Sequence, residues 1–144
     1  MTKIPKYWSK AKIYLSKKDR TMSKLIKKYQ SPSETILTSR RDIFFSLCKS
    51  IIGQQISVAA ANAVFLKFKK KCNNKINAKT VSNLTFSQIK GCGLSRLKVL
   101  GIKSLAKQII DRSFKPKLIP NMTDEEAIIY LSNLRQIGRW SAEM

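Results

Sequence analysis

The sequence predicts an all-α protein, a compact bundle of short helices, from two observations. Apolar residues recur at helical spacing along most of the chain, whereas no stretch of five or more residues alternates cleanly between apolar and polar. No Asn-Gly or Asp-Gly hairpin turn occurs either. The chain has 144 residues, of which 43% are apolar. That is enough for the core of one domain and too much for a disordered basic tail.

Each predicted helix carries a stripe of apolar residues three or four positions apart, and several follow a side chain that can cap the first amides. In chain order, the stripes are Trp8, Ala11 and Leu15; Met22, Leu25, Ile26 and Tyr29 behind Asp19; Phe44, Leu47, Cys48 and Ile51 behind Asp42; Val99, Ile102, Ala106 and Ile109 behind Ser95; and Ala127, Tyr130, Leu131 and Leu134.

Two capping boxes mark further helix starts. Thr123 and Glu126 open the helix that carries the last stripe, and Thr85 and Gln88 open a short helix that Gly91 is expected to end. A connecting loop is predicted between two prolines, Pro116 and Pro120.

Composition favours a polyanionic partner and excludes several kinds of catalytic site. The chain has 29 Lys and Arg against 8 Asp and Glu, a net charge of +21, which favours nucleic acid over a merely soluble surface. Because histidine is absent, there is no Ser-His-Asp triad, Cys-His pair or His-ligated zinc. Cys48, Cys72 and Cys92 fit no metal or disulfide pattern, so we expect small fillers in a reducing compartment.

No targeting or membrane segment is expected. The N-terminal residues lack an apolar core, and the longest apolar stretch, residues 58–68, contains Asn62 and Lys67 and is too short for a bilayer. We therefore expect a cytoplasmic, bacterial-type intracellular monomer with no membrane partner, cofactor or metal.

Residues 50–57 depart from the ordinary core pattern. An apolar helix runs into Gly53, then the amides of Gln54 and Gln55, then Ser57, which can cap the next helix. One interpretation is a tight helix–helix corner whose glutamines cap backbone groups. The other is a probe, since an amide on a rigid corner can enter a duplex and bond to disturbed bases.

Residues 134–142 are the second unusual segment. They follow an amphipathic helix and open another, with Gly138 in the turn and Arg139 and Trp140 after it. Such a turn can aim backbone N–H groups at an anion such as a DNA phosphate. The alternative is a plain helix–helix turn with a buried tryptophan.

Together, the sequences GQQIS at residues 53–57 and IGRWSA at residues 137–142 resemble the helix–hairpin–helix (HhH-GPD) DNA glycosylase superfamily, in particular its 3-methyladenine DNA glycosylase II branch. Residues 42–47 leading to Ile52 and Gly53, and Gly93-Leu94-Ser95 ahead of Lys98, resemble segments of the same family. The resemblance spans roughly residues 8–144. It implies one partial glycosylase domain over 1–144, with the helix–hairpin–helix motif from about 123 to 144 and its second helix cut short.

The resemblance also implies roles for individual residues. Gln55 matches the wedge that fills the place of the extruded nucleotide, and Trp140 matches an aromatic wall of the base pocket. An indole face attracts the positive ring of an alkylated purine by about 0.5–2 kcal/mol. The remaining residues expected to contact DNA are Gln54, Gln136, Ile137, Gly138 and Arg139.

Two departures from the family pattern are visible. Gln136 replaces the first hairpin glycine, which costs about 1 kcal/mol if that position needs a positive φ. The family's catalytic Asp is expected roughly 20 residues beyond Trp140, after a helix and a short loop. Glu143 is the only acid after Trp140 and lies too close to it. We therefore expect a C-terminally truncated chain with no catalytic residue of its own and no activity alone.

Three functions remain open. The first is base excision repair by an N-glycosylase of the 3-methyladenine type, a hydrolase that cleaves the N-glycosidic bond of alkylated bases flipped out of double-stranded DNA. The second is a non-catalytic helix–hairpin–helix DNA-binding module, suggested by the missing Asp. The third is a basic RNA- or ribosome-associated protein, which explains the charge but not the paired glutamines or Trp140.

Overall fold

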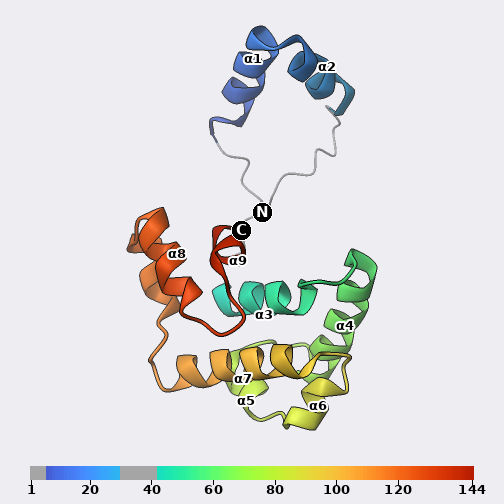
Figure 1. Cartoon of the computed structure of the whole chain (residues 1–144), viewed down its shortest axis with the longest axis vertical. Helices are drawn as coiled ribbons and strands as arrows, with labels where there is room; N and C mark the ends of the chain where they lie inside the picture. The colour runs from blue at the N-terminus through green and yellow to red at the C-terminus, as the bar shows by residue number, and fades with distance from the viewer. Residues whose placement is uncertain (1–5, 30–41) are drawn as a thin grey trace. The chain divides into compact units, whose positions relative to one another are not determined.

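The structure, a computed structural model, describes residues 6–29 and 42–144, which contain nine α-helices, one 3-10 helix and no strand. This confirms the all-α prediction (Figure 1). The chain divides into two compact units, residues 1–41 and 42–144. None of the described helices is long and apolar enough to cross a bilayer.

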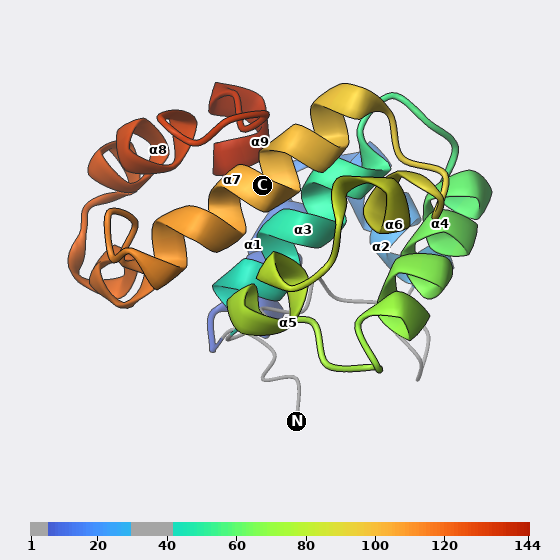
Figure 2. The ribbon, with the colours of Figure 1, turned by 90° about the horizontal axis from the view of Figure 1, so that it is seen from below.

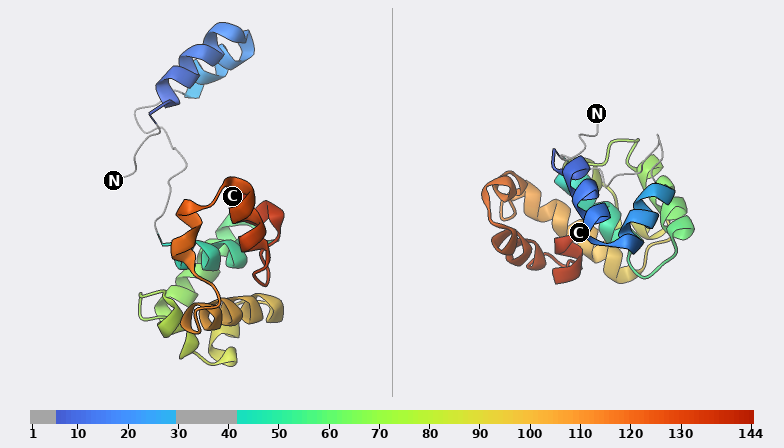
Figure 3. Two further views of the ribbon diagram at one scale, coloured as in Figure 1. Left: turned by 90° about the vertical axis from the view of Figure 1, so that its left-hand side faces the viewer. Right: turned by 90° about the horizontal axis from the view of Figure 1, so that it is seen from above.

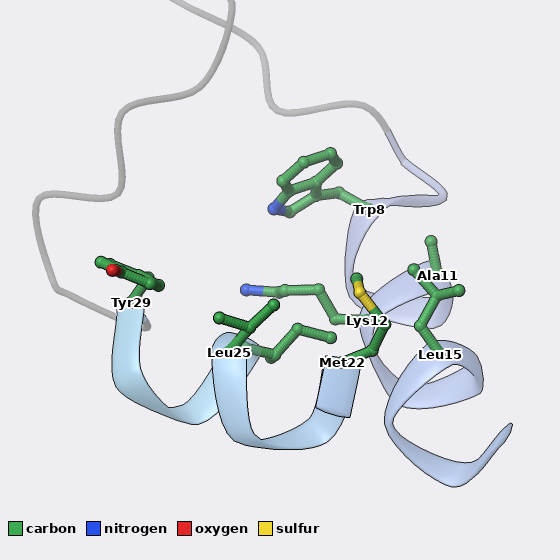
Figure 4. Close-up of a pocket in the computed structure, with 8 residues that line it drawn as sticks. Trp8, Ala11, Lys12, Leu15, Met22, Leu25 and Tyr29 are labelled. Carbon is green, nitrogen blue, oxygen red and sulfur yellow. The ribbon is translucent and has the colours of Figure 1, made fainter. Parts of the chain in front are cut away.

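The first unit is a pair of helices, α1 (Trp8–Lys18) and α2 (Arg20–Tyr29), which pack against each other. Asp19 separates them, and its carboxylate accepts a hydrogen bond from the amide of Met22 at 2.7 Å, as its predicted capping role requires. The predicted stripes line a groove of about 270 Å³ between the helices (Figure 4). No residue of either helix is fully buried, because two short helices have too little surface to enclose a core.

The second unit is built around α7 (Arg96–Ile110), which packs against three other helices, α3 (Ile43–Gly53), α5 (Ala78–Ser82) and α6 (Phe86–Lys90). Figure 2 shows α7 crossing close to α3 and α5. The remaining elements are α4 (Val58–Lys71), a 3-10 helix η1 (Pro116–Asn121), α8 (Asp124–Ser132) and α9 (Arg139–Glu143).

The predicted stripes supply part of the core of the second unit, and other elements supply the rest. The fully buried side chains from the stripes include Cys48, Ile51, Val99 and Ile102. Those outside the stripes include Ile52, Phe68, Val81 and Ile89. Cys72 and Cys92 are buried as well, so all three cysteines are small fillers of the core and not of the surface. Burial raises the pKa of the Cys72 thiol to about 11 and that of Cys48 further still, so these thiols stay protonated at neutral pH.

The predicted caps are all present. The side chains of Asp42, Ser57 and Ser95 accept hydrogen bonds from amides three residues later, and both capping boxes are complete. Gly91 ends α6 as expected. The caps therefore fix the residues at which α3, α4 and α7 begin. These helices position the two unusual segments, residues 50–57 and 134–142.

Two elements differ from the sequence prediction. The predicted loop between Pro116 and Pro120 is the 3-10 helix η1, because the fixed φ of proline suits a first helical turn and its missing N–H has no partner to lose there. Helix α5 was not predicted. Its five residues are too few to show a stripe, although Asn77 caps it by accepting from the amide of Thr80 at 2.9 Å.

Candidate nucleic-acid interface

The first unusual segment forms a corner between α3 and α4, defined here as residues 53–57. Helix α3 ends at Gly53, and Ser57 caps α4. Between them, Gln55 has a φ of 58°, in the left-handed region that residues other than glycine seldom adopt. Its side chain is exposed. The corner thus exposes the side chain of Gln55. Its backbone conformation is unfavourable for glutamine, so the surrounding contacts must maintain it.

The second segment forms a hairpin between α8 and α9, defined here as residues 134–138. Leu134 and Ile137 are buried at 5% and 4% exposure and fix the turn to the core. Gln136 has a φ of 68°, so the position does require the positive φ that a glycine would adopt more easily. Figure 3 shows α8 and α9 side by side around this turn.

The hairpin amides are not equally available to a ligand. The N–H of Ile137 donates to the carbonyl of Leu134 at 3.1 Å and is therefore used inside the turn. Gly138 caps α9, and the first amides of a helix have no carbonyl partner within it. The donors that remain for an anion are those from Gly138 onward, while Ile137 serves as an apolar anchor.

Gly138 leaves open space beside the backbone. Its φ is −92°, which any residue can adopt, and an added Cβ would meet no atom within 4 Å. Neither backbone strain nor packing within the described residues therefore explains a glycine here. Glycine is a favoured N-cap residue, and without a Cβ it also leaves room for an external group to approach the backbone.

The corner and the hairpin are joined directly, although 82 residues separate them in the sequence. The side-chain amide of Gln54 donates to the carbonyl of Gln136 at 2.7 Å and lies 3.5 Å from the hydroxyl of Ser141. Figure 1 shows α9 and the hairpin lying over α3. Each of the two interpretations therefore holds for one glutamine. Gln54 caps a backbone carbonyl, as in a helix–helix corner, while Gln55 faces outward, as a probe would.

Helix α7 supports both turns. The ammonium of Lys98 donates to the carbonyls of Ile52 at 2.9 Å and Gln54 at 2.6 Å, and its burial lowers the pKa of Lys98. One turn further, Gly101 gives room to the hairpin, since a Cβ there would lie 2.9 Å from Cγ of Gln136. The sequence placed Lys98 in a family-like segment but indicated no role for it.

Arg139 does not present a free charge. Its guanidinium binds both carboxylate oxygens of Glu125, at 2.7 and 2.8 Å, and its Nε donates to Glu143 at 2.9 Å. The hydrogen bond from Arg139 lowers the pKa of Glu125. A phosphate at this end of the hairpin would therefore compete with two carboxylates, which the sequence did not indicate because Glu125 belongs to the preceding helix.

Trp140 is 73% exposed, which contradicts the alternative of a buried tryptophan in a plain turn. Trp140 lies in the first turn of α9, directly after the hairpin in the sequence, so its indole is available to an external ring.

Three lysines lie together on a different element. Lys67, Lys70 and Lys71 at the end of α4 line a concavity of about 390 Å³ together with Gly91 and Cys92. Within the described residues, no group of three or more His, Cys, Asp or Glu could hold a metal ion.

Comparison with known proteins gives consistent matches. The HhH-GPD superfamily of base excision DNA repair proteins matches residues 48–140, a span that includes the corner and the hairpin. The chain is 29% identical over 139 residues to DNA-3-methyladenine glycosylase 1 of Schizosaccharomyces pombe, covering 94% of this chain and 61% of that protein. It is 26% identical over 141 residues to the alkylbase DNA glycosidase-like protein mag2 of the same yeast, covering 95% and 66%.

Solved structures agree. The S. pombe 3-methyladenine DNA glycosylase (Mag1), in complex with abasic DNA, superposes with a TM-score of 0.80 at 27% identity, covering 92% of this chain and 66% of that one. A Bacillus halodurans DNA-3-methyladenine glycosidase gives 0.73 at 19% identity, covering 100% and 64%, and shows the same fold.

This chain therefore spans between 61% and 66% of the length of the yeast relatives that it matches. The family match covers more than half of the chain and contains both turns. On this evidence, the chain belongs to the HhH-GPD superfamily of base excision DNA repair proteins.

Proposed function

We propose that this chain is the DNA-binding part of a DNA N-glycosylase that removes alkylated bases of the 3-methyladenine type. The observation that carries the proposal is the direct contact of the two turns, with Gln55 and Trp140 exposed beside them. Yeast relatives named as a 3-methyladenine glycosylase and an alkylbase glycosidase-like protein support the substrate class. The finer assignment to the type II branch is proposed on the sequence motifs alone.

The corner and the hairpin have complementary tasks in this proposal. The free amides from Gly138 onward hold a phosphate, and Gln55 occupies the gap that the extruded nucleotide leaves. Unstacking a damaged base requires only a few kcal/mol, so extrusion itself favours lesions. Trp140 then stacks on the extruded base, and a positively charged alkylpurine ring gains about 0.5–2 kcal/mol from the indole face.

Gln54 and Ile137 act within the protein rather than on DNA. Their polar groups are already bonded inside the corner and the hairpin. Arg139 contacts phosphate only if it exchanges a carboxylate partner, so its contribution to affinity is expected to be small.

We further propose that the catalytic acid lies beyond Met144 in the complete protein. Glu143 follows Trp140 too closely and is bonded to Arg139 at 2.9 Å. The chain alone is then expected to bind DNA without releasing bases. The chain is proposed to form part of a single glycosylase domain that acts as an intracellular monomer, cytoplasmic as expected from the sequence, on double-stranded DNA.

The proposal is tested by incubating alkylated duplex DNA with residues 1–144 and with the complete protein. The complete protein should release 3-methyladenine, and residues 1–144 should bind the duplex without release. Binding should weaken linearly in log affinity against log salt, with a slope of about −0.9 per phosphate contact. Failure of the complete protein to release any damaged base would reject the proposal.

A second candidate, a non-catalytic DNA-binding module, is favoured by Glu143, the one acid after Trp140 in the given sequence, which is bonded to Arg139 at 2.9 Å. An aspartate after a short apolar helix in the downstream coding sequence would decide for the enzyme. If the complete protein binds abasic DNA but releases nothing, the module is correct.

A further inference from the structure

We propose that Lys98 and Gln54 are positioning residues that lock the corner and the hairpin into one unit. Lys98 fixes the backbone that leads into Gln55, and Gln54 transmits that position to the hairpin. The role of this unit on DNA rests on the proposed function. Its existence as one unit rests only on the contacts between α3, α7 and the hairpin.

The first step is the clamp at the end of α3. The last carbonyls of a helix lack partners within it and carry a partial negative charge. The ammonium of Lys98 donates to two of the carbonyls in this region, those of Ile52 and Gln54, at 2.9 and 2.6 Å. Hydrogen bonds from a charged donor are stronger than those between neutral groups, so this clamp holds the corner firmly.

The second step concerns the peptide plane before Gln55, which the Lys98 ammonium holds. The carbonyl oxygen of Gln54 belongs to the peptide plane that precedes Gln55, and the orientation of that plane sets φ of Gln55. This φ is 58°, a value that a glutamine leaves readily for negative φ when nothing opposes it. The ammonium at 2.6 Å therefore maintains the backbone that aims the Gln55 side chain outward.

The third step carries the position to the hairpin. The side-chain amide of Gln54 donates to the carbonyl of Gln136 at 2.7 Å. That oxygen belongs to the peptide plane that follows Gln136, the left-handed residue of the hairpin, whose φ is 68°. Both hydrogen bonds thus act on a peptide next to a strained glutamine, and the same residue, Gln54, takes part in each.

The chain supplies a matched control on the same helix. The ammonium of Lys103 also donates to two carbonyls, those of Ser82 at 3.0 Å and Leu84 at 2.7 Å, and both lysines are half-buried. Both hydrogen bonds of Lys103 go to the end of α5 and the residues after it, and none goes to the corner or the hairpin. Replacing either lysine by methionine removes a double clamp, but only Lys98→Met should loosen the corner.

The experiment compares K98M, K103M, K98R and Gln54→Met in the 144-residue chain by backbone hydrogen exchange. K98M should raise exchange at least about tenfold in the last turn of α3, at residues 51–53, and also at Ile137, whose N–H donates to the carbonyl of Leu134. K103M should raise it only around residues 82–84. K98R should restore part of the protection, and Gln54→Met should loosen Ile137 while sparing more of α3. If K98M leaves Ile137 as protected as K103M does, the inference is wrong.

A second readout measures the ratio of affinities for a duplex with an abasic analogue and for an intact duplex. K98M should reduce this ratio about tenfold, equivalent to about 1.4 kcal/mol, while K103M leaves it unchanged. Equal loss in both variants would make Lys98 merely structural and overturn the inference. If the unsubstituted chain shows no preference for abasic DNA, the proposed function fails, and the exchange measurement still decides whether the two turns are coupled.

Discussion

The corner and the hairpin solve one structural problem by different means. Each joins two helices through a glutamine with a left-handed φ, Gln55 at 58° and Gln136 at 68°. The corner is held by polar contacts, chiefly the Lys98 ammonium on two carbonyls. The hairpin is held by apolar anchors, Leu134 and Ile137, which are almost fully buried.

The two turns should therefore respond to different changes. Apolar anchoring depends on buried area, so the hairpin should lose most stability when Leu134 or Ile137 is truncated. By contrast, the Gln54 hydrogen bond controls only the hairpin's peptide at Gln136. A charge-assisted clamp depends on one protonated group and its two acceptors, so the corner should fail locally while the core stays intact.

The largest effect should follow Ile137→Ala. Removing this buried side chain leaves a cavity under the hairpin and should lower the free energy of unfolding by about 2–5 kcal/mol, measured by urea denaturation. Ile129→Ala is the matched control, because Ile129 is 57% exposed on α8. Its effect should stay within about 0.5 kcal/mol. Equal effects in the two variants would show that the hairpin is not anchored through Ile137.

Gly101→Ala should have the next largest effect. The new Cβ would lie 2.9 Å from Cγ and 3.1 Å from Cβ of Gln136, so the hairpin must shift at an expected cost of about 1–3 kcal/mol. A double variant with Gln136→Gly removes those atoms and should recover part of the loss in thermal denaturation. Strict additivity of the two changes would disprove direct contact between α7 and the hairpin.

Gly138→Ala separates binding from stability. Because the added Cβ meets no atom within 4 Å, only the poorer capping by alanine should affect unfolding, by about 0.5 kcal/mol. DNA affinity, measured by fluorescence anisotropy, should fall because the methyl group occupies the space of a phosphate. Unchanged affinity would remove Gly138 from the proposed interface.

The smallest expected effect is a pH dependence of stability in acid, caused by the Glu125–Arg139 pair beside the hairpin. Its bond to Arg139 holds the pKa of Glu125 below its ordinary value of 4.5, so the ionised carboxylate stabilises the folded state. That stability is complete above pH 4.5 and is lost as pH falls through the lowered pKa. Melting temperatures of the unsubstituted chain and Glu125→Gln should therefore differ at neutral pH and converge in acid. A constant difference would contradict the pairing.

Local patterns predicted most of the fold, and long-range contacts are what they missed. The caps at Asp42, Ser95 and Thr123 follow from residues three positions apart, so the sequence alone identifies them. The resemblance to the family raised the question whether residue 136 needs a positive φ, because the hairpins of that family commonly carry glycine there. The bond from Gln54 to Gln136 crosses 82 residues, and no periodicity encodes it.

The site residues divide in the same way. The outward direction of Gln55 and the 73% exposure of Trp140 depend on how the helices pack, which left the buried alternative open for Trp140. The pairing of Arg139 with Glu125 depends on the approach of α8 to α9. Lys98 had a recognisable sequence context, yet its two carbonyl partners appear only when α7 lies against the end of α3.

The central claim, that the corner and the hairpin form one DNA-binding surface, is tested most directly by nuclear magnetic resonance. A duplex containing an abasic analogue is titrated into the ¹⁵N-labelled chain, and the backbone amide shifts are followed. We expect the amides of residues 54–58 and 136–141 to shift together, with the same apparent affinity. Shifts confined to the lysines at the end of α4, Lys67, Lys70 and Lys71, with both turns unaffected, would contradict it.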